Sequence, residues 1–235
     1  MTGLTSYELQ GRVATITLDD GKVNALSIAM LEAVHAAFDR AEEDGAVVLL
    51  SGREGYLSAG FDLKVFKEEP QRIVEMLTLG ATLCERILAF PTPVLVASSG
   101  HAIAAGSFLL LAADLRIGAE GPFKLGLNEV QIGLTVPLFV VELARQRLAP
   151  AAFSRALVTA AMYAPGEAVT AGFLDRVVPA AELLDASRAA AEQLAALDPE
   201  AHRATKLRVR SEALKAVRAG INAELRANEG AGSVE

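Results

Sequence analysis

Two short turns of small residues are the parts of this chain best suited to do chemistry. They are Ser58-Ala59-Gly60 and Ala104-Ala105-Gly106, and each follows an expected buried strand and leads into a helix. Small side chains let a ligand approach the backbone, and amides at a helix start lack an intrahelical acceptor and lie at the positive end of the helix dipole. Two such turns side by side could direct two N–H groups at one oxygen, which is an oxyanion hole. Because small-residue turns are also common as purely structural features, the pattern does not define a function by itself.

The elements that must position these turns alternate between strands and helices. Val47–Leu50 and Val94–Ala97 are continuous apolar runs, typical of strands buried on both faces. Ser27 is a suitable N-cap for a helix that reaches Asp44. The remaining elements expected in the first half are a hairpin around Gly11, a helix over 72–89, an apolar helix ending at Ala113 and a strand over 114–117. This alternation predicts an α/β fold.

Helical patterning dominates after Pro137. A short helix is expected from Pro165 to Gly172, because proline suits a first turn and glycine ends a helix. A strand over 176–178 and two alanine-rich helices should follow. An apolar stripe on the last helix could pack on the parent domain or on another subunit; it comprises Leu207, Leu214, Ile221 and Leu225.

Composition excludes several classes of protein. The chain has 235 residues, of which 52% are hydrophobic and 22% charged, so one folded domain with a helical appendage is expected. The net charge of −7 argues against a nucleic-acid partner. Cys84 is the single cysteine, so no intrachain disulfide can form. The three histidines are far apart in sequence and no Cys/His spacing resembles a metal site, so no metal is expected.

One uncharged stretch has the length of a membrane span. Residues 94–113 contain no Asp, Glu, Lys or Arg. However, Ser98-Ser99-Gly100-His101 lies in its middle and no basic flank anchors it, so a buried strand, a loop and a buried helix are expected instead. The N-terminus has no signal-peptide pattern. We therefore expect a cytoplasmic protein with no membrane partner.

Five segments of the chain resemble motifs of the crotonase, or enoyl-CoA hydratase/isomerase, superfamily. Their order and spacing are kept from about residue 5 to residue 220. The segments are Ser58-Ala-Gly-Phe-Asp-Leu-Lys64, Pro93–Gly106, Asp114-Leu-Arg-Ile117, Gly126-Leu-Asn-Glu-Val-Gln-Ile-Gly133 and Ala168-Val-Thr-Ala-Gly-Phe-Leu-Asp-Arg-Val-Val178.

This resemblance implies a fold of repeated ββα units wound into a superhelix. Residues 1–180 would form the core domain, 181–227 a C-terminal helical region used in oligomerisation, and 228–235 a disordered tail. The implied assembly is a homotrimer or homohexamer. The implied substrate is an acyl-CoA thioester, with coenzyme A as part of the substrate and no tightly bound cofactor.

The resemblance also implies roles for individual residues. The backbone N–H groups of Phe61 and Ala105 would bind the thioester oxygen, and Glu129 would be the general base. The backbone of the first turn would contact CoA, and Asn128 would orient the carboxylate or bind substrate. Lys64 could place a cation nearby or be an ordinary solvated residue. The CoA contacts of the first turn would come from Ala59, Gly60, Asp62 and Leu63.

The sequence departs from the hydratase pattern at Phe108. Hydratases of the superfamily use a second glutamate two residues after the last glycine of the second turn, which is Gly106 here. Because phenylalanine cannot handle a proton, water addition should be weak, whereas a double-bond shift needs only one carboxylate. The motifs are closest to those of mitochondrial-type Δ3,Δ2-enoyl-CoA isomerases. Isomerisation is therefore the leading hypothesis, with hydration and non-catalytic acyl-CoA binding as alternatives.

Two further hypotheses are weaker. Ser98, Ser99 and Ser107 near His101 could suggest a serine hydrolase, but the chain has no G-x-S-x-G elbow. An acyl tunnel is suggested by apolar residues that core packing explains equally well, namely Phe66, Val136, Leu138 and Phe139. The chain has no G-x-G-x-x-G or P-loop motif, so neither NAD nor ATP is implied.

Overall fold

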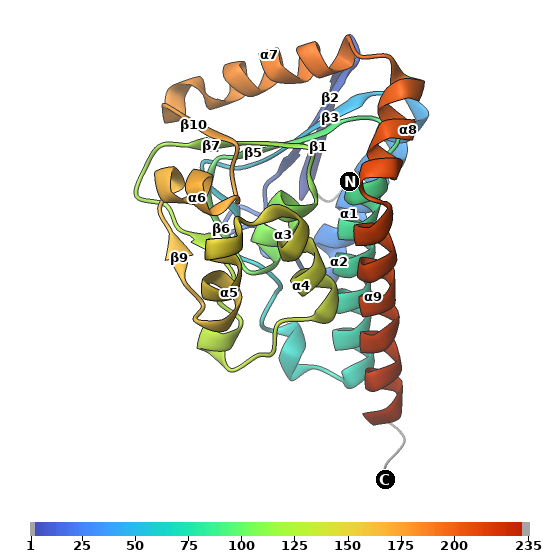
Figure 1. The fold of residues 1–235 in the computed structure, drawn as a ribbon, viewed down its shortest axis with the longest axis vertical. Helices are drawn as coiled ribbons and strands as arrows, with labels where there is room; N and C mark the ends of the chain where they lie inside the picture. Colours follow the sequence, from blue (N-terminus) through green and yellow to red (C-terminus); the bar gives the residue numbers. More distant parts are fainter. Residues whose placement is uncertain (1–2, 232–235) are drawn as a thin grey trace.

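Two β-sheets form the framework of the chain (Figure 1). The computed structural model describes residues 3–231, and side chains through residue 224. A six-stranded sheet has the order β1-β2-β3-β5-β7-β10, and a four-stranded sheet has the order β4-β6-β8-β9. The hairpin predicted around Gly11 is confirmed as β1 (Thr5–Gln10) and β2 (Val13–Leu18).

The body of the fold is a unit of two strands and a helix that recurs along the chain. In each unit the first strand joins the six-stranded sheet, the second joins the four-stranded sheet, and a helix follows. This confirms the superhelix of ββα units. The units are β3 (Val47–Gly52), β4 (Gly55–Ser58) and α2 (Pro70–Ala89); β5 (Val94–Ser98), β6 (Gly100–Ile103) and α3 (Ala105–Ala112); and β7 (Leu115–Ala119), β8 (Leu125–Gly126) and α4 (Leu138–Arg147).

Short strands lie between the buried strands and the two turns, where the local sequence pattern predicts none. β4 lies within residues 51–60 and β6 within residues 98–106. Their residues, Gly-Tyr-Leu-Ser and Gly-His-Ala-Ile, have no clear alternating pattern. Pairing between the two segments, rather than local propensity, makes them strands.

Two apolar cores lie on opposite faces of the six-stranded sheet. The main core is filled by α1 (Ile28–Glu43), α2 and α3 on the face toward the four-stranded sheet. Ser27 caps α1 as predicted, because its side chain accepts a hydrogen bond from the Met30 N–H. On the other face, α7 (Leu183–Ala195) covers Val47, Leu49 and Leu95 (Figure 1).

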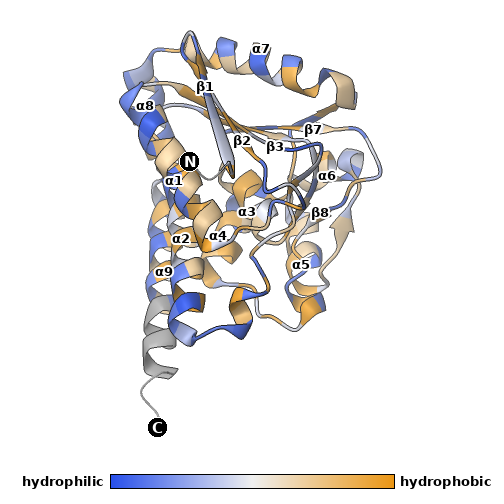
Figure 2. Ribbon diagram, turned by 180° about the vertical axis from the view of Figure 1, so that it is seen from behind, coloured by the Kyte–Doolittle hydropathy of each residue, from blue (hydrophilic) through white to orange (hydrophobic). Residues whose placement is uncertain are grey.

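The C-terminal part returns to the core through buried ion pairs. It comprises α5 (Pro150–Val158), β9 (Met162–Tyr163), α6 (Pro165–Ala171), β10 (Arg176–Val178), α7, α8 (Pro199–Val209) and α9 (Ser211–Ala231), with a short 3₁₀ turn at η3 (Ala180–Glu182). Two further 3₁₀ turns lie earlier in the chain, η1 (Val65–Lys67) and η2 (Val130–Ile132). Asp114 contacts Lys206 Nζ at 2.7 Å and Arg210 Nη2 at 2.9 Å. Helix α8 is otherwise mostly hydrophilic (Figure 2), so these pairs fix its position on the core.

The end of the chain differs from the prediction in two respects, the division of the last helix and the extent of the tail. The expected last helix is two helices, with Leu207 on α8 and 37% exposed. Leu214 and Ile221 of α9 are buried in the chain's own core, beside α2 and α4; the side chain of Leu225 lies outside the described part. Residues 228–231, expected in a disordered tail, form the last turn of α9. Residues 232–235 of that expected tail lie outside the described residues.

No helix between residues 3 and 231 is long and apolar enough to cross a membrane. The uncharged stretch over 94–113 is divided among β5, β6 and α3, as its polar middle predicted, except that the middle contains a strand.

Candidate active site

The two small-residue turns meet at one edge of the four-stranded sheet. Strands β4 and β6 are parallel neighbours, so the chain leaves both on the same side. A Cβ atom placed on Gly60, whose φ is +99°, would lie 3.0 Å from the Ala104 Cβ and 3.4 Å from the Ala105 nitrogen. A Cβ atom on Gly106 would collide with the backbone oxygen of Ser58. Both glycines are therefore required for this close approach.

The Phe61 N–H group is not used in the bridge that Phe61 forms with Leu26. Leu26 and Phe61 form an isolated parallel bridge. The two bonds of this bridge use the flanking residues, since Leu26 N donates to Gly60 O at 2.8 Å and Asp62 N donates to Leu26 O at 3.4 Å. The Phe61 amide itself donates to no described residue. It is therefore available to an external acceptor.

The Ala105 N–H group is available for a different reason. Ala105 is the first residue of α3, so its amide has no acceptor four residues earlier in the helix. Ala104 before it has φ +50° and ψ −121°, an unusual conformation for alanine that turns the chain sharply from β6 into the helix. The Ala104 amide is bonded to Gly126 O at 2.9 Å, whereas the Ala105 amide has no acceptor among the described residues.

Glu129 lies three residues beyond the strand that borders the second turn. Gly126 of β8 pairs with Ile103 of β6, one residue before Ala104. Glu129 is 5% exposed, the only carboxylate classed as buried among the described side chains. Neither of its carboxylate oxygens has a hydrogen-bond partner in the described structure. The adjacent Asn128 likewise has a buried side-chain oxygen without a partner.

Burial brings the pKa of Glu129 close to neutral pH. Loss of hydration disfavours its charged form and raises the pKa of Glu129 to about 7. A carboxylate of this pKa can accept a proton and return it at physiological pH. The structure therefore combines two free amide donors with a poised carboxylate, the set of groups that a proton transfer next to a thioester requires.

The pH dependence of the reaction follows from this pKa. Because the base must be ionised, we expect kcat/KM to rise about tenfold per pH unit below pH 7 and to level off above it. Initial rates at saturating and limiting substrate concentrations between pH 5 and pH 9 would measure this. A profile already level at pH 5.5 would exclude Glu129 as the group that titrates.

An aromatic wall stands where hydratases carry their second acid. Phe108 is 2% exposed. Its ring makes edge contacts with Phe61 (centroids 6.1 Å apart) and with Phe139 (5.9 Å). The Phe61 ring lies against Gly80 of α2, where an added Cβ would be 2.5 Å from ring carbons. The three rings therefore form an apolar surface around Phe108.

The residues expected to contact CoA lie on the first turn, but most of their amides are already used. Ala59 N donates to Val23 O at 3.0 Å, Gly60 N to Ser58 Oγ at 3.1 Å and Asp62 N to Leu26 O. Leu63 is 58% exposed and Lys64 is exposed as well, so both are accessible to a ligand. The CoA contacts of this turn stay predictions. They would have to come from carbonyls, side chains and the Leu63 amide.

The residues suggested for an acyl tunnel differ in exposure. Phe139 is buried beside Phe108, and Phe66 and Val136 are half-buried against the main core. Leu138 is 52% exposed. Their role in binding an acyl chain also stays a prediction.

The serine hydrolase hypothesis has no geometric support. Ser107 Oγ donates to Ala102 O at 2.6 Å, Ser98 Oγ to Gly100 O at 3.1 Å and Ser99 Oγ to Arg53 O at 2.8 Å. The ring of His101 accepts from Lys124 N. Each hydroxyl is therefore engaged with backbone rather than with an imidazole base.

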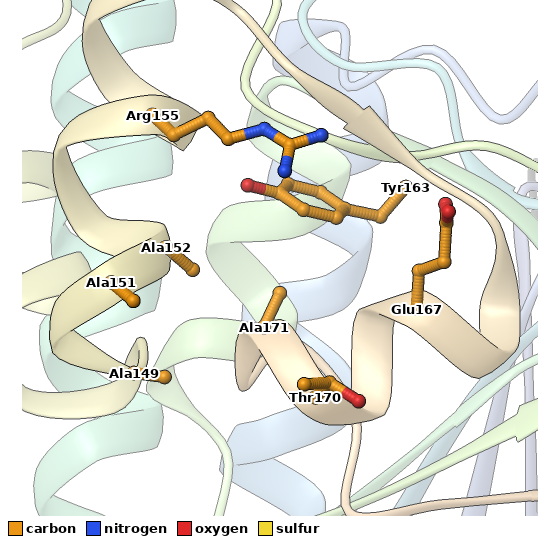
Figure 3. Close-up of a pocket in the computed structure, with 8 residues that line it drawn as sticks. All are labelled: Ala149, Ala151, Ala152, Arg155, Tyr163, Glu167, Thr170 and Ala171. Atoms are coloured by element: carbon orange, nitrogen blue, oxygen red, sulfur yellow. The ribbon is translucent and has the colours of Figure 1, made fainter.

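A hollow of about 390 Å³ lies away from these groups, between α5 and α6 (Figure 3). Its floor is the ring of Tyr163, with the Arg155 guanidinium 5.6 Å from the ring centroid. None of the predicted site residues lines it. Among the described residues, no cluster of three or more His, Cys, Asp or Glu side chains could hold a metal ion.

Sequence reasoning missed the residues that hold the first turn in place. Asn24 is fully buried with φ +52°, and its side-chain amide donates to Leu18 O at 2.9 Å and to Leu57 O at 3.2 Å. The available signal was the polar Asn24 in the short spacing between Asp19-Asp20-Gly21 and the N-cap Ser27.

Comparison with known proteins agrees with the geometry. The enoyl-CoA hydratase/isomerase family model matches residues 8–234. Human mitochondrial enoyl-CoA delta isomerase 1 is 29% identical over 203 residues, covering 84% of this chain and 67% of the relative. A putative enoyl-CoA hydratase of Thermus thermophilus is 33% identical over 211 residues, covering 84% and 80%. A solved enoyl-CoA hydratase/isomerase family protein of Pseudomonas syringae superposes with a TM-score of 0.93 at 47% identity, covering 96% of this chain and 98% of that one.

The chain belongs to the enoyl-CoA hydratase/isomerase family, within the crotonase superfamily. Members of this family act on CoA thioesters. The names of the relatives include both isomerases and hydratases, so the family alone leaves the reaction open.

Proposed function

We propose that this enzyme is a Δ3,Δ2-enoyl-CoA isomerase that uses Glu129 as its single acid–base group. The observation that carries the proposal is the pairing of a buried, unpartnered Glu129 with the apolar Phe108 at the position of the second acid. The human relative named above is an isomerase by name, which supports the same reaction.

The reaction needs one base and one oxyanion hole. Glu129 removes a proton from C2 of a 3-enoyl-CoA, and the electrons move into the thioester to give a dienolate. The amides of Phe61 and Ala105 stabilise its oxygen, and each such donor is typically worth roughly 2.7 to 4 kcal/mol. The protonated Glu129 then returns the same proton at C4, which leaves the double bond between C2 and C3.

Hydration would need a group that this site lacks. Water addition to a 2-enoyl-CoA requires a second group to position and activate the water, typically worth about 10²- to 10⁴-fold. Of the described side chains around Phe108, the nearest ring neighbours are Phe61 and Phe139. None of the three can activate water, so the proposed isomerase should hydrate its product only slowly.

Purified protein assayed with 3-hexenoyl-CoA and with crotonyl-CoA tests the proposal. Isomerisation of the first at a rate far above hydration of the second is the expected result. Faster hydration of crotonyl-CoA would establish a hydratase instead. Binding of both thioesters without turnover would establish a non-catalytic acyl-CoA-binding protein and overturn the proposal.

We also propose that the enzyme assembles as a homotrimer or homohexamer. Support comes from large apolar side chains left exposed on the C-terminal helices and their connections, since such residues often mark interfaces. Light scattering coupled to size-exclusion chromatography would measure the mass of the assembly. A monomer would contradict this proposal. The exposed residues are Leu184 (57%), Leu197 (47%), Leu207 (37%) and Val209 (78%).

A further inference from the structure

Two fully buried serines hold the turns that present the free amides. Ser58 and Ser107 are each 0% exposed, and each side-chain hydroxyl both donates a hydrogen bond to backbone and accepts one from backbone. Neither hydroxyl belongs to the groups that contact a substrate in the proposed reaction. Each nevertheless lies within three residues of Phe61 or Ala105 in the sequence and bonds the backbone of the same turn or of the strand before it.

Ser58 connects the first turn to a rigid anchor. Its Oγ donates to Asn24 O at 2.6 Å and accepts from Gly60 N at 3.1 Å. This anchor is the backbone around Asn24, and several contacts hold it in place. Asn24 is fully buried, and the Asp20 carboxylate accepts hydrogen bonds from the amides of Lys22, Asn24 and Ala25. The Gly60 amide is one peptide before the Phe61 amide. Fixing the first therefore restricts the rotation that would turn the second away from its target.

Ser107 does the same for the second turn. Its Oγ donates to Ala102 O at 2.6 Å and accepts from Gly126 N at 3.1 Å. Those bonds tie the start of α3 to β6 and to β8, the strand that leads to Glu129. Ala105 lies in sequence between Ala102 and Ser107. The same hydroxyl therefore sets the distance between the Ala105 amide and the segment that carries Glu129.

The two turns also bear directly on each other. Gly106 lies so close to Ser58 O that no side chain fits between them. A shift of either serine is therefore transmitted to the opposite turn. We propose that Ser58 and Ser107 are positioning residues that set the separation and direction of the Phe61 and Ala105 amides toward a single enolate oxygen. This inference rests on the proposed function, because it assumes that both amides serve one oxygen.

The test compares Ser58→Ala and Ser107→Ala with a matched control, Ser51→Ala. Ser51 is 1% exposed and its hydroxyl donates to Ala97 O, so the control also removes a buried serine hydroxyl but touches neither turn. We expect kcat with 3-hexenoyl-CoA to fall about 10- to 100-fold in the two test variants, since small misplacements of positioned groups have effects of this size. The KM of the two test variants should change less than about twofold, because an interaction made only in the transition state affects kcat. Both kcat and KM of the Ser51→Ala control should also change less than about twofold.

A spectroscopic titration gives a second readout that loss of stability alone would not move. Acetoacetyl-CoA forms an enolate that absorbs in the ultraviolet, and its stability reports directly on the two amides without turnover. The pH at which the bound ligand ionises should rise by about one to two units in the test variants, equivalent to 10- to 100-fold weaker stabilisation. Ser58→Cys retains a weaker donor and acceptor and should fall between wild type and Ser58→Ala.

The outcomes separate this inference from the proposed function. If wild type stabilises the enolate but does not isomerise 3-hexenoyl-CoA, the proposed function fails and the serine comparison still decides the inference. If the test variants ionise acetoacetyl-CoA at the same pH as Ser51→Ala, the inference is wrong, whatever the isomerase activity. If Ser58→Ala does not fold, the same comparison is made with Ser58→Cys and Ser107→Ala, and the same results decide it.

Discussion

Replacing Glu129 by glutamine is expected to lower kcat for 3-enoyl-CoA isomerisation by about 10³- to 10⁴-fold, the upper part of the range for acid–base catalysis. The effect is large because one carboxylate both removes and returns the proton in the proposed reaction, and no other described carboxylate is buried. Product binding should change little, since the amides of Phe61 and Ala105 are untouched. Steady-state rates with 3-hexenoyl-CoA and calorimetric titration with 2-hexenoyl-CoA would measure both quantities.

Stability measurements on the same variant provide an internal control. Because burial raises the folded-state pKa of Glu129 to about 7, the carboxyl group stabilises the fold while protonated, and this contribution is lost as the pH rises from below 4.5 through 7. Glu129→Gln should therefore be more stable than wild type at pH 8, by at most about 3 kcal/mol, and nearly equal at pH 4. Glu120→Gln makes the same change on an exposed residue and should alter neither rate nor stability. Full activity in Glu129→Gln would remove Glu129 from the mechanism.

The parts of the fold that local pattern specifies were predictable. The continuous apolar runs at β3 and β5, the Ser27 cap of α1 and the Pro165 and Gly172 boundaries of α6 all agree with the structure. In each case a short-range rule acts alone, either burial on both faces or the hydrogen-bonding needs of a helix end. The helix that Gly172 ends has a left-handed cap with φ +97°, which glycine adopts readily.

Features created by distant contacts were not predictable from local pattern. Strand β6 exists because it pairs with β4 and β8. The interruption between α8 and α9 contains neither proline nor glycine. It occurs at Arg210, whose guanidinium donates to Leu88 O and Ala113 O and pairs with Asp114, so tertiary bonds direct the chain there. The sequence near position 210 gives no indication that Arg210 contacts Leu88, Ala113 and Asp114.

The candidate site also combines features that local sequence predicts with features that only distant contacts determine. Gly60 and Gly106 could be identified as sites of close backbone approach, and the structure brings them together. Glu129 follows a polar Asn128 and has the local character of a surface residue, so only its resemblance to the family motif indicated burial. The conformation of Ala104 could not be foreseen, because φ +50° is unusual for alanine and is imposed by the bonds of Ala104 N and Ser107 Oγ to β8 and β6. The sequence thus indicated the candidate groups, and the tertiary bonds determine how these groups are placed.

Replacing Gly106 by alanine should separate the two turns and lower kcat by about 10²- to 10³-fold, the loss typical when one oxyanion donor is misdirected. The added methyl group would occupy the position of Ser58 O, which is backbone and cannot rotate aside. Either the start of α3 or the first turn must move, and the amides of Ala105 and Phe61 then no longer converge. Glu129 lies on another segment, so the pH at which kcat/KM levels off should stay near 7 while its plateau falls.

The matched control for this change is Gly166→Ala on α6. Gly166 is also a helical glycine, but an added Cβ would meet nothing within 4 Å, so the variant should keep wild-type kcat and gain stability by roughly 0.5 to 1 kcal/mol from helix propensity. Rates with 3-hexenoyl-CoA and the ionisation of bound acetoacetyl-CoA should both be measured for the two variants. A Gly106→Ala enzyme that stabilises the enolate as well as Gly166→Ala does would mean that the two amides do not act on one oxygen. In that case Glu129 and a single amide donor would have to account for the whole reduction of the barrier. The ratio of the wild-type rate to the rate of the Glu129→Gln variant would then measure the share that Glu129 contributes.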